Sequence, residues 1–185
     1  MLRLFGTNPL QAAAALAYRR VVEQARQPGF FVAGGIPDTV DGRFELICLH
    51  AFLYLHRLRR EKNQAAALGQ RFFDLMFADF DRSLREMGTG DLSVGREVKR
   101  MAQAFYGRIA AYEAGLKADD ATLEAALARN LFGTAAPTSA QLRAMAGYLR
   151  REAARLDGED ASRLLAGEVG FGAPPAAEVA AEARV

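Results

Sequence analysis

The residues most capable of chemistry lie together in the stretch FELICLHAFLYLHRL, residues 44–58, which contains Cys48, His50 and His56. A zinc-binding histidine pair on a helix takes the spacing His-Glu-x-x-His, which puts both imidazoles on one face. His50 and His56 are six residues apart, so their side chains point in different directions around a helix. Cys48 is the only cysteine, which excludes an internal disulfide and any zinc cluster built from cysteines.

Apolar neighbours predict a structural role for His50 and Cys48. His50 lies between Leu46, Leu49 and Leu53, and a buried imidazole normally finds a hydrogen-bond partner. We therefore expect a hydrogen-bonded core histidine. The alternative is a haem ligand, for which the sequence offers no evident second ligand. Cys48 is expected to be an inert buried thiol.

Two further patterns resemble functional motifs without meeting their requirements. Asp74, Asp79 and Asp81 could offer carboxylates to a metal ion, but they point in different directions around one predicted helix, whereas metal ligands must converge. The loop GTG at residues 88–90 lacks both the Lys-Ser/Thr ending of a phosphate-binding loop and a preceding strand. The sequence therefore predicts a protein that is not an enzyme and that uses no metal and no cofactor.

The 44–58 stretch must be positioned by neighbours on most sides, because its apolar residues form two adjacent stripes. The first stripe follows the helical period and contains Phe44, Ile47, Cys48, Ala51, Tyr54, Leu55 and Leu58. The second contains Leu46, Leu49 and Leu53. We predict a buried central helix over about 42–60. Its continuous apolar run, residues 46–55, is shorter than the ~20 residues that span a bilayer.

The rest of the chain predicts a single all-α domain, a bundle of about six helices around this central one, with no strand pattern and no internal repeat. The six expected helices span 9–27, 42–60, 63–87, 94–116, 119–132 and 138–156, and an irregular link is expected over 30–40. The domain is expected to cover residues 1–172, and residues 173–185 are expected to form a flexible C-terminal tail.

Polar residues at the expected helix starts predict how these helices are capped. Asp41 is placed to cap the central helix, and Asp91 or Ser93 can cap the fourth. Thr138 and Gln141 have the spacing of a capping box at the start of the sixth.

Charge is nearly balanced over the 185 residues, with a net charge of +2, but it is unevenly distributed. Residues 96–117 carry five basic and two acidic side chains, whereas residues 118–185 have a net charge of −3. This asymmetry is compatible with an anionic partner, such as RNA, a ribosome or lipid headgroups, but charge alone favours a solvated charged surface. The N-terminal sequence lacks the apolar core of a signal peptide, so we expect a cytoplasmic protein that can contact the inner membrane peripherally.

The segment GTGDLSVGREVKRMAQAFYGR, residues 88–108, resembles the central signature of the ubiquinol–cytochrome c chaperone family. The preceding Phe80-Asp81 and Arg85-Glu86-Met87 belong to the same likeness. An earlier block, IPDTVDGRFE at residues 36–45, is similar to an earlier block of that family. The two blocks stand in the family's order, and the resemblance extends over roughly residues 18–115.

The eukaryotic members of this family are mitochondrial assembly factors for the cytochrome bc1 complex, which bind newly made cytochrome b together with a small partner protein. The resemblance therefore implies a bacterial-type, non-enzymatic chaperone that holds cytochrome b or another bc1 subunit. It also implies contact with the ribosome, the membrane surface and a small helical partner protein, and no small-molecule substrate.

The 88–108 block is also the predicted contact surface. Its expected members are Asp91, Arg96, Lys99, Arg100 and Arg108, and Arg43 is expected to join them from the start of the central helix. Asp91 would set the loop geometry, and the basic side chains would contact the partner. The alternative is that the block serves structure alone, through its loop and the packing of Phe105 and Tyr106.

Two other classes of protein remain as alternatives. The helix–GTGD–helix pattern could belong to a helical nucleic-acid- or ribosome-binding regulator with a basic second helix. Against this, Met101, Phe105 and Ile109 lie on the expected buried face of that helix. A helical enzyme whose residues come from several helices is the third class.

Overall fold

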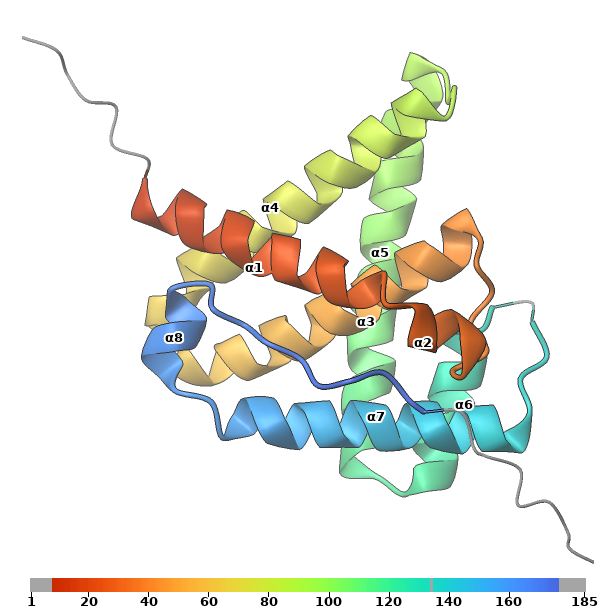
Figure 1. Ribbon diagram of the computed structural model, residues 1–185. Coiled ribbons are helices and arrows are strands. Elements are labelled where there is room, and N and C mark those ends of the chain that lie inside the picture. The colour runs from red at the N-terminus through yellow and green to blue at the C-terminus, as the bar shows by residue number, and fades with distance from the viewer. Residues whose placement is uncertain (1–7, 134, 177–185) are drawn as a thin grey trace, which may run out of the picture.

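The computed structural model describes residues 8–133 and 135–176, and within these ranges the chain forms helices and no strand. Six long helices are joined by two short ones (Figure 1). The helices are α1 (Pro9–Ala25), α2 (Pro28–Val32), α3 (Val40–Leu58), α4 (Asn63–Glu86), α5 (Asp91–Lys117), α6 (Asp120–Asn130), α7 (Ser139–Asp157) and α8 (Ala161–Leu165). A 3-10 turn, η1 (Arg59–Glu61), extends α3. The predicted all-α fold is confirmed.

The α3 helix lies at the centre of the molecule, as its two apolar stripes predict. Of its 19 residues, 12 are buried. The α1 helix crosses over α3 and also packs on α4, α7 runs along another side of α3, and α5 lies behind it (Figure 1). Each large apolar side chain buried in this way contributes about 1.5–3 kcal/mol to folding.

The cap of α3 differs from the predicted one. The Thr39 carbonyl accepts the first helical hydrogen bond, from the Arg43 N–H at 3.0 Å, so the helix begins before Asp41. The Thr39 hydroxyl accepts a second one from the Gly42 N–H at 3.1 Å. The prediction that Asp41 caps α3 is therefore wrong, and Asp41 lies in the first turn, where a carboxylate is favoured by the helix dipole.

The capping box at the start of α7 is confirmed. The Gln141 N–H donates to the Thr138 hydroxyl at 3.2 Å, and the Thr138 N–H donates to the Gln141 side-chain oxygen at 2.8 Å.

The link between α1 and α3 is more ordered than predicted, because it contains α2. The sequence rule treats Pro28 as the end of a helix, but proline also suits the first position of a new one, and Pro28 begins α2. Phe30 on α2 is fully buried, and its ring packs edge-on against His50 and Tyr148, with centroid distances of 5.2 and 5.0 Å.

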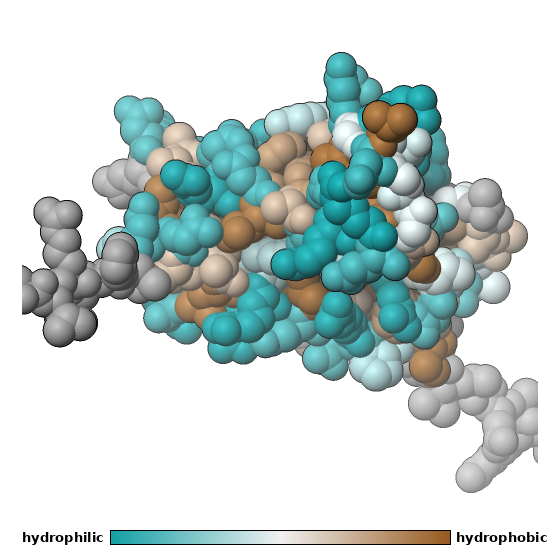
Figure 2. Space-filling view, turned by 90° about the horizontal axis from the view of Figure 1, so that it is seen from above, coloured by the Kyte–Doolittle hydropathy of each residue, from teal (hydrophilic) through white to brown (hydrophobic). Residues whose placement is uncertain are grey.

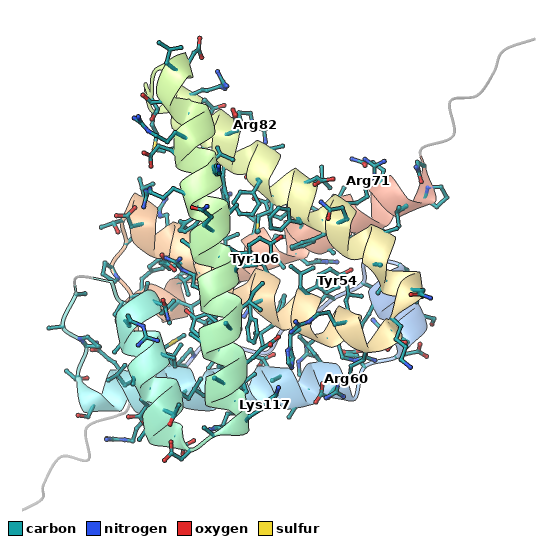
Figure 3. The ribbon with its side chains drawn as sticks, turned by 180° about the vertical axis from the view of Figure 1, so that it is seen from behind. Tyr54, Arg60, Arg71, Arg82, Tyr106 and Lys117 are labelled. Atoms are coloured by element: carbon teal, nitrogen blue, oxygen red, sulfur yellow. The ribbon has the colours of Figure 1, made fainter. Side chains whose placement is uncertain are left out.

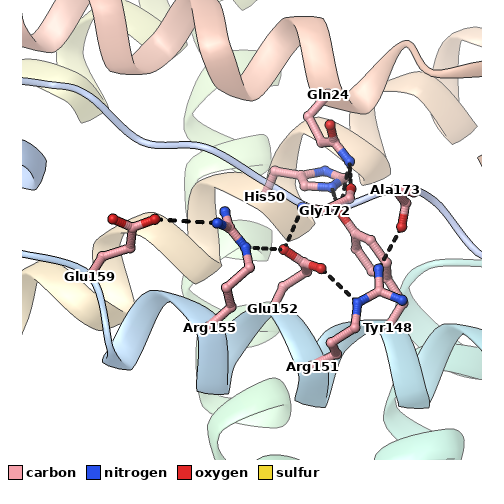
Figure 4. A network of polar contacts seen from close by, with 9 residues as sticks. All are labelled: Gln24, His50, Tyr148, Arg151, Glu152, Arg155, Glu159, Gly172 and Ala173. Carbon is pink, nitrogen blue, oxygen red and sulfur yellow. Dashed lines mark hydrogen bonds and ion pairs between the residues drawn. The ribbon is translucent and has the colours of Figure 1, made fainter.

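His50 is a buried core histidine with both ring nitrogens hydrogen-bonded, as predicted. Figure 4 shows it beside Tyr148 and Gln24. Its Nδ1 lies 2.7 Å from the Leu46 carbonyl oxygen, which can only accept, so Nδ1 carries the proton. Nε2 therefore accepts from the Tyr148 hydroxyl at 2.8 Å. The Tyr148 hydroxyl in turn accepts from Gln24 on α1 at 3.0 Å, so one chain of hydrogen bonds joins α3, α7 and α1.

The segment after α8 crosses back between α1 and α7 (Figure 1) and is fixed by polar contacts. The buried Glu152 carboxylate accepts from the Gly172 N–H at 2.8 Å and pairs with Arg151 and Arg155 (Figure 4). Residues 173–176 continue this packed segment, and Pro175 is buried. The remainder of the predicted tail, 177–185, lies outside the described residues and stays a prediction.

The buried imidazole predicts a pH dependence of stability. Burial lowers the pKa of His50 from 6.5 to about 4, and its hydrogen bond to the Leu46 carbonyl only partly opposes this. Between pH 6.5 and about 4, His50 is protonated in the unfolded chain but not in the folded chain. The free energy of unfolding should therefore fall across this window, by up to ~1.4 kcal/mol per pH unit from this residue.

Denaturant unfolding of the wild type and His50→Gln at several pH values between 7.5 and 4 measures this contribution. The carboxylates titrate in both proteins, so the difference between the two slopes isolates His50. Equal slopes would contradict the prediction.

Candidate binding surface on the α4–α5 hairpin

The α4 and α5 helices form a hairpin that rises out of the helical body (Figure 1). Aromatic side chains join its two arms. Phe73 on α4 stacks on Tyr106 on α5 with 5.7 Å between ring centroids, and Phe77 packs against Phe105 at 6.2 Å. This seam fixes the arms relative to each other, so side chains on their outer faces have defined positions.

The tip of the hairpin exposes apolar side chains. Leu92 is 100% exposed and Met87 is 53% exposed. Gly90 occupies the cap position of α5 without a side-chain cap, so the prediction that Asp91 or Ser93 caps this helix is wrong. Asp91 already lies in the first turn of α5, and its carboxylate pairs with Arg85 across the loop.

Arg96, Lys99 and Arg100 lie together on one exposed side of α5, at spacings that share a helix face. Arg100 donates to Glu97 at 2.9 Å. Arg96 and Lys99 make no hydrogen bond or ion pair with any residue that the structure describes. Their predicted role in partner binding stays a prediction, and their positions leave them accessible for it.

The other two predicted basic contacts have partners within the chain. The Arg108 guanidinium makes two hydrogen bonds to the Glu45 carboxylate of α3, with Nε 2.5 Å from Oε2, and lies 5.7 Å from the centroid of the Phe44 ring. Burial raises the pKa of Glu45, and Arg108 opposes that shift. Arg43 pairs with Asp38 at 2.6 Å on the surface. Arg108 thus fastens α5 to α3, about 18 Å along the helix from Arg96.

A groove of 290 Å³ lies between the end of α3, the start of α4 and the middle of α5, and the sequence did not predict it. Its lining is apolar except at the mouth, and it includes no aspartate or glutamate. The lining residues are Leu55, Leu58, Arg59, Lys62, Ala65, Ala66, Gly69, Gln70, Phe73, Phe105, Tyr106 and Ile109. The small residues at the start of α4 leave this space open, so the run AAALG at residues 65–69 is the signal that could have indicated it.

Tyr106 lies on the side of α5 that faces α4 and is 60% exposed at this groove (Figure 3). Viewed from above the hairpin, hydrophobic residues are interspersed with hydrophilic ones (Figure 2).

The described residues contain no group of three or more His, Cys, Asp or Glu side chains placed to hold a metal ion. Among the helices described, none is long and apolar enough to cross a membrane. An open apolar groove beside a basic helical face is suited to binding another molecule. The fold defines an all-helical protein, and these two surfaces are its candidates for binding another molecule.

The sequence comparison identifies the family. The ubiquinol-cytochrome C chaperone family matches residues 32–171, which is most of the chain, and this chain belongs to that family. The predicted resemblance is thereby confirmed, and the match extends well beyond residue 115, where the predicted resemblance ends.

Similar proteins carry related names. Ubiquinol-cytochrome-c reductase complex assembly factor 1 from Xenopus laevis is 29% identical over 163 residues, 86% of this chain and 80% of that protein. The Mus musculus protein of that name is 30% identical over 163 residues, and the match covers 55% of its length, so this chain spans about half of the mouse relative. The crystal structure of the Cbp3 homolog from Brucella abortus has a TM-score of 0.81 and 36% identity, and the match covers 89% of this chain and 91% of that one.

The contrast between Arg108 and Arg96 predicts different effects of the same substitution. Arg108→Met leaves the Glu45 carboxylate, whose side chain is 11% exposed, without its partner, and should lower the free energy of unfolding by about 3 kcal/mol. Arg96→Met removes an exposed side chain and should change it by less than about 0.5 kcal/mol. Denaturant unfolding of both variants measures the difference, and similar losses in the two would refute the structural role of Arg108.

Proposed function

We propose that this chain is an assembly chaperone for the cytochrome bc1 complex, ubiquinol–cytochrome c reductase, and that it holds newly made cytochrome b before that subunit joins the complex. Family membership and the names of the relatives support the first part. The observation that carries the second part is the open apolar groove between α3, α4 and α5. A membrane subunit outside its complex exposes apolar side chains, and a groove of this kind can cover them.

The proposed mechanism is holding, with no bond-breaking step. The groove covers apolar side chains of the client, while Arg96, Lys99 and Arg100 meet phosphate groups of the membrane surface or of ribosomal RNA. The protein then acts at the cytoplasmic side of the inner membrane as a peripheral protein. A small helical partner protein is a further proposed component of the complex.

Deletion of the gene together with affinity purification tests the client. A tagged chain purified from native membranes in mild detergent should enrich cytochrome b over an abundant unrelated membrane protein. Cells without the chain should lose absorbance of b-type haem, and the untagged gene should restore it. Recovery of ribosomes or DNA-binding proteins without bc1 subunits, and unchanged haem absorbance in the deletion strain, would exclude the proposal in favour of a nucleic-acid- or ribosome-binding regulator.

The basic face of α5 is tested by charge reversal. The triple variant Arg96→Glu, Lys99→Glu, Arg100→Glu should keep its helix content and melting temperature, because all three side chains are exposed, but lose association with membranes or client. A matched control reverses Arg19 and Arg20 on α1 and Arg26 at the C-terminal cap of that helix, which are also exposed. Binding by the wild type should weaken with salt, because exposed charges are screened. Equal binding by the triple variant and the control would place the contact elsewhere.

A further inference from the structure

We propose that the α3–α4–α5 groove binds one face of a helix of the held subunit through two large apolar side chains one turn apart. We further propose that Lys62, at the groove mouth, binds an aspartate or glutamate side chain of that helix. This inference rests on the proposed function and specifies the chemistry of the segment that is held.

The size of the groove sets what can enter it. Its 290 Å³ is about twice the ~150 Å³ that accommodates one benzene-sized group, which leaves room for two large side chains. A helix presents such a pair on one face at positions three or four residues apart. Insertion of one helix face into an apolar groove is a recurring mode of protein recognition.

The walls of the groove leave space that a ligand can occupy and that no side chain of the protein fills. A Cβ added at Gly69 would find one side chain within 4 Å, the Leu55 Cδ2 at 3.6 Å, so the chain itself leaves this space unused. On the opposite wall, Tyr106 stacks on Phe73 and remains 60% exposed. Rigid, partly exposed aromatic side chains are characteristic anchors of protein interfaces.

Lys62 is held in a conformation that ordinarily favours glycine. Its φ is +49° and its ψ is −125°, in the turn between η1 and α4. Backbone strain of this kind is found at functional sites, where the surrounding structure maintains it. Lys62 lines the groove and is exposed, and its ammonium has no hydrogen bond or ion pair with any described residue.

The charges at the mouth favour a carboxylate. Arg59 lines the same groove, but its guanidinium is paired with Glu113, which leaves Lys62 as the cation available to a ligand. One ammonium can pair with a single carboxylate, whereas Arg59, the other cation of the lining, is already paired and does not add a second donor for a phosphate group. The occupant we propose is therefore a protein helix with an acidic residue rather than a phospholipid with its acyl chain in the groove.

Filling the groove tests the site itself. The probes are fluorescent 20-residue peptides that tile cytochrome b of the same organism, and their binding to the purified full-length chain is followed by anisotropy. Gly69→Phe should weaken binding of the tightest peptide by about tenfold or more. The control Gly147→Phe changes a glycine of α7 that also has open space around an added Cβ, and it should leave binding unchanged. Equal binding by the two variants, or no peptide bound by the wild type, overturns the proposal.

Lys62→Gly separates a binding role from a purely structural one. Glycine relieves the backbone conformation, so the melting temperature should rise, while affinity for the tightest peptide should fall by about threefold to fivefold. Replacing the acidic residue of that peptide by its amide should lower affinity for the wild type by the same factor and have no further effect on Lys62→Gly. A raised melting temperature with unchanged affinity overturns the role of Lys62.

A lipid probe and a cellular readout complete the test. If lyso-phosphatidylglycerol binds the wild type but not Gly69→Phe, and no peptide competes with it, the groove is a lipid site and the proposed helix occupant is wrong. In the deletion strain, Gly69→Phe should fail to restore b-type haem absorbance, and Gly147→Phe should restore it. Full restoration by Gly69→Phe would overturn the groove proposal and leave the assembly function intact. Unchanged absorbance in the deletion strain itself would instead remove the assembly function.

Discussion

The burial of α3 on most of its sides is the constraint on which the structure depends. Polar groups on such a helix cannot reach water, so each needs a partner on a neighbouring helix. His50 meets Tyr148 of α7, Glu45 meets Arg108 of α5, and the guanidinium of Arg57 donates to a carbonyl at the end of α7 at 2.9 Å. Apolar packing brings the helices together, and these directional contacts specify how each one is oriented around α3.

The α5 helix contacts α3 through the ion pair of Glu45 and Arg108 and, further along, through Phe52 and Tyr112, and the outer part of the hairpin leaves the body beyond these contacts. The aromatic seam between Phe73 and Tyr106 holds α4 beside α5. Where α4 begins, small side chains leave the groove beneath this seam. The buried pair of Glu45 and Arg108 and the aromatic seam hold the helices in place, and the apolar groove between them stays open to solvent.

The fold was predictable to the extent that it follows from local periodicity, and the binding surface was not. The two apolar stripes of 44–58 predict a central helix, and the neighbours of His50 predict its burial. In contrast, Arg108 finds a partner 63 residues away, and the groove exists because residues from three helices do not meet. The ion pair leaves no local pattern in the chain, and the local sign of the groove is the run of small residues AAALG at residues 65–69. The cap by Thr39 was missed because several capping residues compete near one helix start, and tertiary packing decides among them.

The packing interpretation of the 88–108 block holds for some of its residues, and the contact interpretation stays a prediction for others, because the helical period interleaves inward-facing and outward-facing positions. Phe105 and Arg108 face inward and hold α5 to its neighbours, whereas Arg96 and Lys99 face outward and have no partner among the described residues. Tyr106 belongs to both groups, since one face of its ring stacks on Phe73 while much of the side chain stays exposed at the groove. A family signature on such a helix therefore cannot be assigned to structure or to binding as a whole. Each position takes its role from the side of α5 on which it lies.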